Sequence, residues 1–116
     1  MNIKNGRKNN SYCFPQDLQN KLRPALVLRE FPKYGDLLVC GITSRLHQYI
    51  EGFDLLLDNH HKDFASSGLK LPGVCRLNML TMLSIADING AIGEVSHKTH
   101  RVLLKTLSDY LMHQNH

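Results

Sequence analysis

The sequence lacks the features that mark membrane and secreted proteins. Its three cysteines, Cys13, Cys40 and Cys75, lie far apart and form no CxxC pair. No apolar run approaches the roughly 20 residues that a membrane-spanning helix needs. The first twelve residues, MNIKNGRKNNSY, lack the apolar core of a secretion signal. We therefore expect no membrane association and predict a cytoplasmic protein.

The cysteines and glycines also exclude several kinds of chemistry. Cys40 and Cys75 fall inside apolar runs, so we predict buried, reduced thiols that act as small hydrophobic residues. Gly90 and Gly93 lie near each other but lack the strand and helix setting of a phosphate-cradling loop, which argues against a nucleotide-dependent enzyme. No cofactor is expected.

One stretch gathers side chains of the kind that bind metals. Asp58, His60, His61 and Asp63 are close in sequence, but their spacing fits no zinc signature. Polar loops often collect such residues without binding an ion. We therefore expect no metal site.

Length and charge indicate the size of the protein and the kind of partner. A chain of 116 residues is long enough for one domain, spanning residues 1–116, and too short for two ordinary ones. Lys and Arg number 14 against 10 Asp and Glu, which gives a net charge of +4 and favours a polyanionic partner. Residues 1–12 are polar without periodicity, so we predict a flexible or edge segment there.

The stretch from Lys21 to Arg45 is the clearest structural pattern. Two apolar runs, residues 25–28 and 37–42, flank a breaker segment at 31–36, which predicts two strands and a turn. Pro24 holds Arg23 in an extended conformation at the start of the first strand. Antiparallel pairing would bring Arg23 next to Thr43 at one rim. A guanidinium group beside hydroxyl groups is suited to bind phosphate.

Further elements follow along the chain. The patterns predict a loop or short helical turn at 46–52, a strand at 53–58, a polar connection at 59–70, a strand at 74–85 with a helix as the competing interpretation, and short strands around a turn at 88–95. A helix is then predicted after a Ser96 cap, with one apolar face formed by Val102, Leu103, Leu107, Tyr110 and Leu111. These elements predict a mostly β protein, a small barrel with a C-terminal α-helix.

Several of these residues, in this order, resemble the PemK/MazF family of toxins from type II toxin–antitoxin modules. The resemblance rests on these pieces: Phe14-Pro15, Asp17, Lys21, RPALVL at 23–28, ITS at 42–44, Gly68-Leu69, Pro72, Val74, Arg76-Leu77, Ile92-Gly93 and the closing helix. It implies an SH3-like small barrel of the CcdB/PemK/MazF type. It also implies a homodimer, a cognate antitoxin as partner, and metal-independent, sequence-specific cleavage of single-stranded RNA (mRNA).

The resemblance assigns roles to particular residues. Arg23 stands where the family has its catalytic arginine, Thr43 where it has the hydroxyl residue beside it, and Arg76 where the PemK branch has a further active-site arginine. The remaining candidate RNA-binding residues, from neighbouring positions, are Ser44, Arg45, His47 and Asn78. Arg23 and Arg76 would neutralise phosphate charge in the transition state, and Thr43 and Ser44 would position the phosphate or the attacking hydroxyl.

The general base is not evident from the sequence. Asn78 occupies the position where the PemK branch carries an aspartate, and an amide does not exchange a proton near neutral pH. His47, Asp17 and His60 are the candidates because they are near the predicted site in sequence.

Plainer structural roles are open at the same positions. Arg23 could bond a carbonyl or carboxylate at a barrel rim, Arg76 could be a structural ion-pair partner, and Thr43 and Ser44 could be turn residues. The alternative function is a catalytically degenerate family member, or a protein that acts like a gyrase poison through protein–protein binding.

Overall fold

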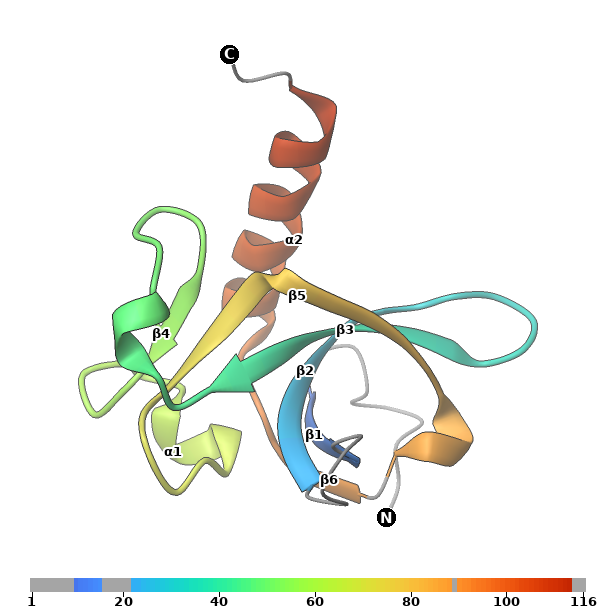
Figure 1. Ribbon diagram of the computed structural model, residues 1–116, viewed down its shortest axis with the longest axis horizontal. Helices are drawn as coiled ribbons and strands as arrows, with labels where there is room; N and C mark the ends of the chain where they lie inside the picture. The colour runs from blue at the N-terminus through green and yellow to red at the C-terminus, as the bar shows by residue number, and fades with distance from the viewer. Residues whose placement is uncertain (1–9, 16–21, 89, 114–116) are drawn as a thin grey trace.

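Six strands form one antiparallel sheet that curls into a half-barrel (Figure 1). The computed structural model describes residues 10–15, 22–88 and 90–113. The strands are β1 (Asn10–Pro15), β2 (Leu22–Glu30), β3 (Asp36–Thr43), β4 (Leu55–Leu57), β5 (Gly73–Ser84) and β6 (Gly90–Glu94), in the order β4-β5-β3-β2-β1-β6. The predicted class, mostly β with a C-terminal helix, is confirmed.

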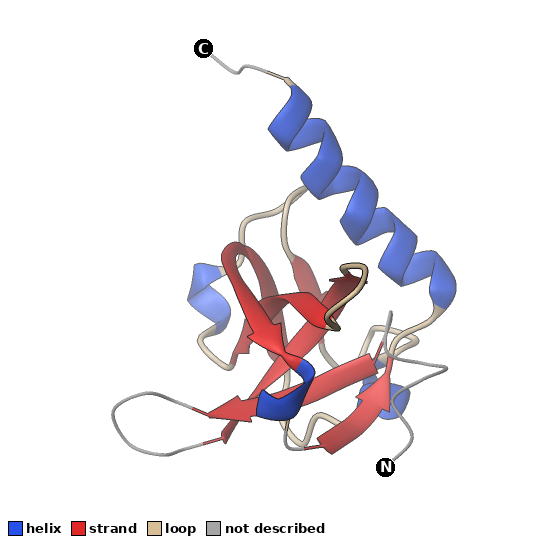
Figure 2. Ribbon diagram, turned by 90° about the vertical axis from the view of Figure 1, so that its right-hand side faces the viewer, coloured by secondary structure: helices blue, strands red, loops and turns tan. Residues whose placement is uncertain are grey.

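The described residues also form four helical segments, three short and one long. They are η1 (Leu46–Gln48), α1 (Phe64–Ser67), η2 (Ile85–Asp87) and α2 (His97–Met112). The predicted cap is confirmed, because the backbone N–H of Thr99 donates to Ser96 Oγ at 3.2 Å. α2 packs along one side of the sheet, and its C-terminal end projects beyond the strands (Figures 1 and 2). No helix among the described residues is long and apolar enough to span a membrane.

The predicted hairpin is formed by β2 and β3. Ala25 pairs with Gly41 and Leu26 with Cys40, and continuing this register places Arg23 opposite Thr43. In the turn, Lys33 and Gly35 both adopt positive φ, at 83° and 75°. The hairpin therefore brings the start of β2 and the end of β3 to one rim.

Both faces of β2 are buried, which explains its unbroken apolar run. Leu26 and Leu28 belong to a core that also contains Cys40, Ile42, Leu57, Cys75, Leu77, Val95, Leu103 and Leu107. Ala25 and Val27 face the other way and pack with Leu37 and Val39. Since neither face of this stretch meets water, the sequence shows no alternation of polar and apolar residues.

The two cysteines predicted to be internal are buried, as expected. Burial raises the pKa of the Cys40 thiol from 9.0 to about 12, and the nearby Asp54 carboxylate adds to the shift. Burial also raises the pKa of Cys75 well above 9.0. Both side chains therefore serve as apolar core residues.

The predicted apolar face of α2 is partly wrong. Leu103 and Leu107 are buried, but Val102, Tyr110 and Leu111 are exposed. The helix buries Thr99 and His100 in their place, and His100 Nε2 lies 2.9 Å from the carbonyl oxygen of Leu28. A polar side chain with a hydrogen-bond partner can thus occupy a core position that hydropathy alone does not identify.

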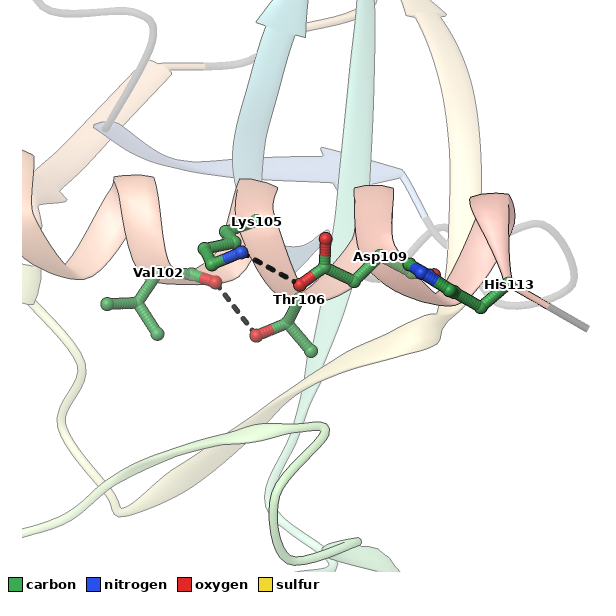
Figure 3. Close-up of polar contacts among 5 residues, drawn as sticks. All are labelled: Val102, Lys105, Thr106, Asp109 and His113. Carbon is green, nitrogen blue, oxygen red and sulfur yellow. Dashed lines mark hydrogen bonds and ion pairs between the residues drawn. The ribbon is translucent and has the colours of Figure 1, made fainter. Parts of the chain in front are cut away.

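The exposed side of α2 is held by contacts within the helix (Figure 3). Lys105 Nζ lies 3.0 Å from Asp109 Oδ2, Thr106 Oγ1 donates to the Val102 carbonyl at 2.8 Å, and His113 Nδ1 lies 2.7 Å from the Asp109 carbonyl. Tyr110 contacts Phe53 edge-to-face, with ring centroids 5.2 Å apart. The three polar contacts stabilise the helix along its exposed side, and the ring contact connects it to the segment before β4.

Other expectations need correction in detail. Residues 10–12, expected in a flexible or edge segment, lie in β1, which pairs with both β2 and β6. The strand predicted at 53–58 shortens to β4, the polar connection contains α1, and 88–95 holds one strand rather than several. The ambiguous stretch 74–85 is the strand β5 over nearly its whole length. Residues 1–9 lie outside the described part of the chain.

The segment considered for metal binding has structural partners of its own. Asp63 is buried, and the Ser96 backbone N–H and hydroxyl donate to its Oδ2 at 3.1 and 2.9 Å. Burial raises the pKa of Asp63, but hydrogen bonds from Thr99 and Ser96 and the nearby His61 more than offset this and leave it below 3.8. Asp63 thus fastens α1 to the start of α2.

Candidate functional site

A pocket of about 290 Å³ opens at the rim where β2 begins and β3 ends. Its lining comes from β2, β3, the segment that follows β3, and β5: Arg23, Pro24, Gly41, Ile42, Thr43, Arg45, Gln48, Arg76 and Met79. Three arginines therefore share one small pocket, and we call it the arginine pocket. The predicted meeting of Arg23 and Thr43 at this rim is confirmed.

Thr43 is fixed at the end of β3. Its side chain is buried, and its Oγ1 accepts a hydrogen bond from the backbone N–H of Arg45 at 3.1 Å. The bond occupies one acceptor position of the hydroxyl group, which keeps its own O–H as a donor. The same bond shapes the turn that carries Arg45.

Arg76 is held from the other side of the pocket. Its Nη1 donates to Gln48 Oε1 at 3.2 Å, and its buried Nε has no hydrogen-bond partner among the described residues. The remaining donors of this guanidinium group provide a planar fork that matches the oxygens of a phosphate group. Gln48 therefore orients Arg76 without neutralising its charge.

A bulge in β5 gives Arg76 its position. Gly41 pairs with Arg76 but the next residue, Cys40, pairs with Leu80, so residues 77–79 are extra on β5. The backbone N–H of Leu77, the first residue of the bulge, donates to Asp54 Oδ1 at 3.1 Å. Met79, also in the bulge, reaches the arginine pocket and packs closely over Gly41.

Asp54 joins this bulge to the segment that carries Gln48. Its carboxylate is 8% exposed, and Oδ2 accepts from the backbone N–H of Ile50 at 3.1 Å. One buried side chain thus ties the residue after Arg76 to the turn that follows η1. Asp54 therefore helps to position the backbone next to both Arg76 and Gln48.

A second pocket, also of about 290 Å³, lies next to the first. Arg23, Pro24, Ile42 and Thr43 line both pockets, and the second adds Ser44, Leu69, Lys70, Leu71, Pro72 and Gly73. Its additional wall is formed largely by leucine and proline side chains. We call it the leucine pocket.

The arginine pocket can bind an anion and stabilise added negative charge. Its three guanidinium groups stay charged at any physiological pH. None of the described residues that line it is a carboxylate or an imidazole. The chemistry that this lining supplies is therefore electrostatic.

The structure brings together most of the predicted site residues. Arg23, Thr43, Arg45 and Arg76 line the arginine pocket, and Ser44 lines the leucine pocket. Asn78 and His47 are exposed and line neither pocket.

The two further candidates for the general base are His60 and Asp17. His60 is exposed and lines neither pocket, and its backbone N–H donates to Asp58 Oδ1. Asp17 lies outside the described residues.

The sequence interpretation missed Gln48, Met79 and Asp54. Gln48 and Met79 reach the pocket only through the turn after β3 and the bulge in β5, which no local pattern predicts. Asp54 does leave a signal in the sequence, because it stands between Phe53 and the apolar run 55–57. A carboxylate among apolar residues is rarely buried without hydrogen-bond partners, and Asp54 is buried with two.

A small curled half-barrel with an arginine-lined pocket at its rim defines the class of protein, and comparison with known proteins defines the family. Residues 10–111 match the family model of PemK-like, MazF-like toxins of type II toxin–antitoxin systems. The chain belongs to this family. A comparison with curated protein sequences finds no match.

Solved structures agree on the fold. The Mycobacterium tuberculosis toxin MazF-mt6 has a TM-score of 0.66 at 19% identity, covering 91% of this chain and 99% of that one. A mycobacterial endoribonuclease in complex with its cognate antitoxin has a TM-score of 0.64 at 16% identity, with complete coverage of both chains. The MazE–MazF structure from Deinococcus radiodurans gives 0.66 at 19% identity, covering 91% and 94%. At these identities the likeness concerns the fold.

Proposed function

We propose that this protein is a metal-independent, sequence-specific endoribonuclease that cleaves single-stranded RNA. The observation that carries the proposal is the arginine pocket, where Arg23, Thr43 and Arg76 converge on a space of about 290 Å³ in a toxin-family fold. We also propose that it acts as a homodimer in the cytoplasm and is inhibited by a cognate antitoxin. The family membership and the antitoxin complexes of similar structures support this setting.

The reaction uses the RNA's own nucleophile. The 2′-oxygen forms a bond to the adjacent phosphorus while the bond from phosphorus to the 5′-oxygen breaks, giving a 2′,3′-cyclic phosphate and a 5′-hydroxyl group. The 2′-hydroxyl loses a proton, and the leaving 5′-oxygen gains one. The arginines stabilise the charge that builds on the phosphate oxygens, and Thr43 donates to one of them.

Proton transfer is assigned to a group outside the described lining. His47 and His60 do not line the arginine pocket, so Asp17, six residues before Arg23, is our leading candidate for the base. A carboxylate base would give a rate that rises with pH until the base is ionised and then levels off. Asp17→Asn should remove that dependence and lower kcat.

The direct test is cleavage of a mixed RNA in EDTA. The wild-type protein should produce fragments that end in cyclic phosphate, and Arg23→Ala should abolish them. Arg29→Ala is the matched control, because Arg29 is an exposed arginine at the far end of the same strand. Intact RNA at high wild-type concentration, or equal cleavage by Arg23→Ala, would refute the proposal.

A non-catalytic protein that acts by binding a protein partner is the second candidate. It is favoured by the absence of a carboxylate or imidazole among the described residues lining the arginine pocket, and by Asn78. Under this alternative, expression would still arrest growth with Arg23→Ala, and RNA would remain uncut. Loss of both growth arrest and cleavage in Arg23→Ala would exclude it.

A further inference from the structure

The leucine pocket shares a wall with the proposed catalytic site but has different chemistry. Arg23 and Thr43 form the ridge between the two pockets. On one side of this ridge lie further arginines, and on the other lie Leu69, Leu71 and Pro72. A phosphate bound at the ridge would therefore have a charged pocket on one side and an apolar one on the other.

We infer that the leucine pocket is a nucleobase subsite, which selects the base next to the phosphate that is cleaved. The inference rests on the proposed function and deepens it. In single-stranded RNA the bases that flank each phosphate can be unstacked, and a base outside a helical stack can pack between aromatic or apolar side chains. Leu71 is 67% exposed at this pocket, so its side chain is available to cover a base.

The wall of the pocket is held rigidly at both ends. Gly68 has a φ of 78° and approaches the backbone of Ile92 so closely that a side chain at residue 68 would clash with it. At the other end, Gly73 pairs with Leu57 and packs against Ile42 and Leu69. A preformed wall loses little conformational freedom when a ligand binds, which favours recognition.

The polar groups of the pocket indicate the kind of base. Lys70 can only donate hydrogen bonds, whereas Ser44 can donate or accept. Guanine and uracil carry a carbonyl acceptor, O6 or O4, at the position where adenine and cytosine carry an amino group that cannot accept from the Lys70 ammonium group. The leucine pocket should therefore prefer guanine or uracil over adenine or cytosine.

The first experiment maps cleavage ends on an RNA pool of random sequence. The wild-type protein should show a preference for guanine or uracil at one position next to the cleaved bond. Lys70→Met keeps the apolar stem and removes the donor, so it should lose this preference while still cutting RNA. Leu71→Ala should lower kcat/KM about fivefold, because the base loses part of the apolar surface against which it packs.

Matched controls separate this effect from a general loss of charge or apolar surface. Leu111→Ala removes an equally exposed leucine, 69% against 67%, from the far end of α2. Lys98→Met removes an exposed lysine that lines neither pocket. Both controls should cleave with the wild-type preference. An unchanged preference in Lys70→Met together with unchanged kcat/KM in Leu71→Ala would overturn the inference.

The second experiment does not depend on cleavage. Uridine, guanosine and adenosine 3′-monophosphates are titrated against the wild-type protein while the NMR signals of the Leu69 and Leu71 methyl groups are recorded. The uridine and guanosine nucleotides should shift these signals at lower concentration than the adenosine nucleotide, and Lys70→Met should remove the difference. Methyl signals that do not move would refute the subsite. Shifts without any RNA cleavage would refute the proposed enzyme and leave the base subsite standing.

Discussion

Asp54 offers the sharpest test of how the arginine pocket is built. Its carboxylate is 8% exposed and accepts hydrogen bonds from the backbone N–H groups of Leu77 and Ile50, each at 3.1 Å. Asp54→Ala would leave both donors without that partner. Asp54→Asn would keep one oxygen acceptor and turn an NH₂ group toward the other donor.

The cost follows from the number of donors that lose a partner. The buried N–H of Leu77 costs about 1–3 kcal/mol when left unsatisfied and the part-buried N–H of Ile50 costs less, so we expect about 2–4 kcal/mol for Asp54→Ala and about half of that for Asp54→Asn. For a chain of this size 1 kcal/mol corresponds to a change in Tm of about 4 °C. Asp54→Ala should therefore melt about 8–16 °C below the wild-type protein, with Asp54→Asn between the two.

The site should weaken together with the fold. Leu77 follows Arg76 in the β5 bulge, and Ile50 follows the segment that carries Gln48, so losing Asp54 frees both partners of the Arg76–Gln48 hydrogen bond. RNA cleavage measured well below the melting temperature should show a lower kcat in both variants.

Thermal unfolding and RNA cleavage together decide the outcome. Asp58→Ala is the control, because Asp58 also accepts a backbone N–H bond, from His60, but in an exposed setting. It should change stability by no more than about 0.5 kcal/mol. The reasoning would be refuted if Asp54→Ala melted within 2 °C of the wild-type protein, a difference of about 0.5 kcal/mol.

Three other predictions concern the second arginine, a buried carboxylate and the thiols. Arg76→Lys keeps the charge but loses the planar fork, so kcat should fall by about 100-fold, and Gln48→Ala should reduce kcat less. The pKa of Asp63 is lowered in the folded protein, so its contribution to stability is present above pH 3.8 and is lost as the pH falls through the folded pKa. Urea unfolding of Asp63→Asn should therefore show a weaker loss of stability below about pH 4 than the wild-type protein. Burial raises the pKa of Cys40 to about 12 and that of Cys75 well above 9.0, so iodoacetamide at pH 8 should label them, by peptide mass spectrometry, only after unfolding.

The hairpin could be predicted because its signals are local. The apolar runs at 25–28 and 37–42 and the breaker segment between them lie within 25 residues, and antiparallel pairing then determines which ends meet. The position of Arg23 next to Thr43 follows from that register alone. This half of the arginine pocket needs no information from distant residues.

The other half depends on contacts between segments that are distant in sequence. Gln48 and Arg76 are 28 residues apart, and Asp54 and Leu77 are 23 apart. The bulge that turns Arg76 into the pocket is stabilised by Asp54, and a bulge leaves no periodic pattern. The sequence therefore identified Arg76 as a site residue only through the resemblance to the family. It did not predict the contacts that hold the Arg76 side chain.

The misplaced residues of α2 have a related cause. Hydropathy predicted that Val102, Tyr110 and Leu111 would face the core. Val102 directly precedes the buried Leu103 and lies on the exposed side of the helix, whereas Tyr110 and Leu111 belong to the last turns, which extend beyond the sheet (Figures 1 and 2). Leu103 and Leu107 alone reach the core among the five predicted residues. A helix longer than the surface it covers exposes apolar side chains at its far end, and sequence periodicity does not reveal the extent of that surface.

The ridge formed by Arg23 and Thr43 separates two tasks that one pocket would combine poorly. Stabilising a phosphate requires fixed charges that act equally on every nucleotide, because the phosphate carries no sequence information. Distinguishing bases requires apolar contact and a few directed hydrogen-bond donors. A cluster of guanidinium groups in the same pocket would bind any anion and so reduce this selectivity. The fold places the charges on β2, β5 and the turn after β3, and the apolar wall in the segment 69–72 between α1 and β5. Substitutions in that segment can therefore change which RNA is cut while the arginine pocket continues to cut it.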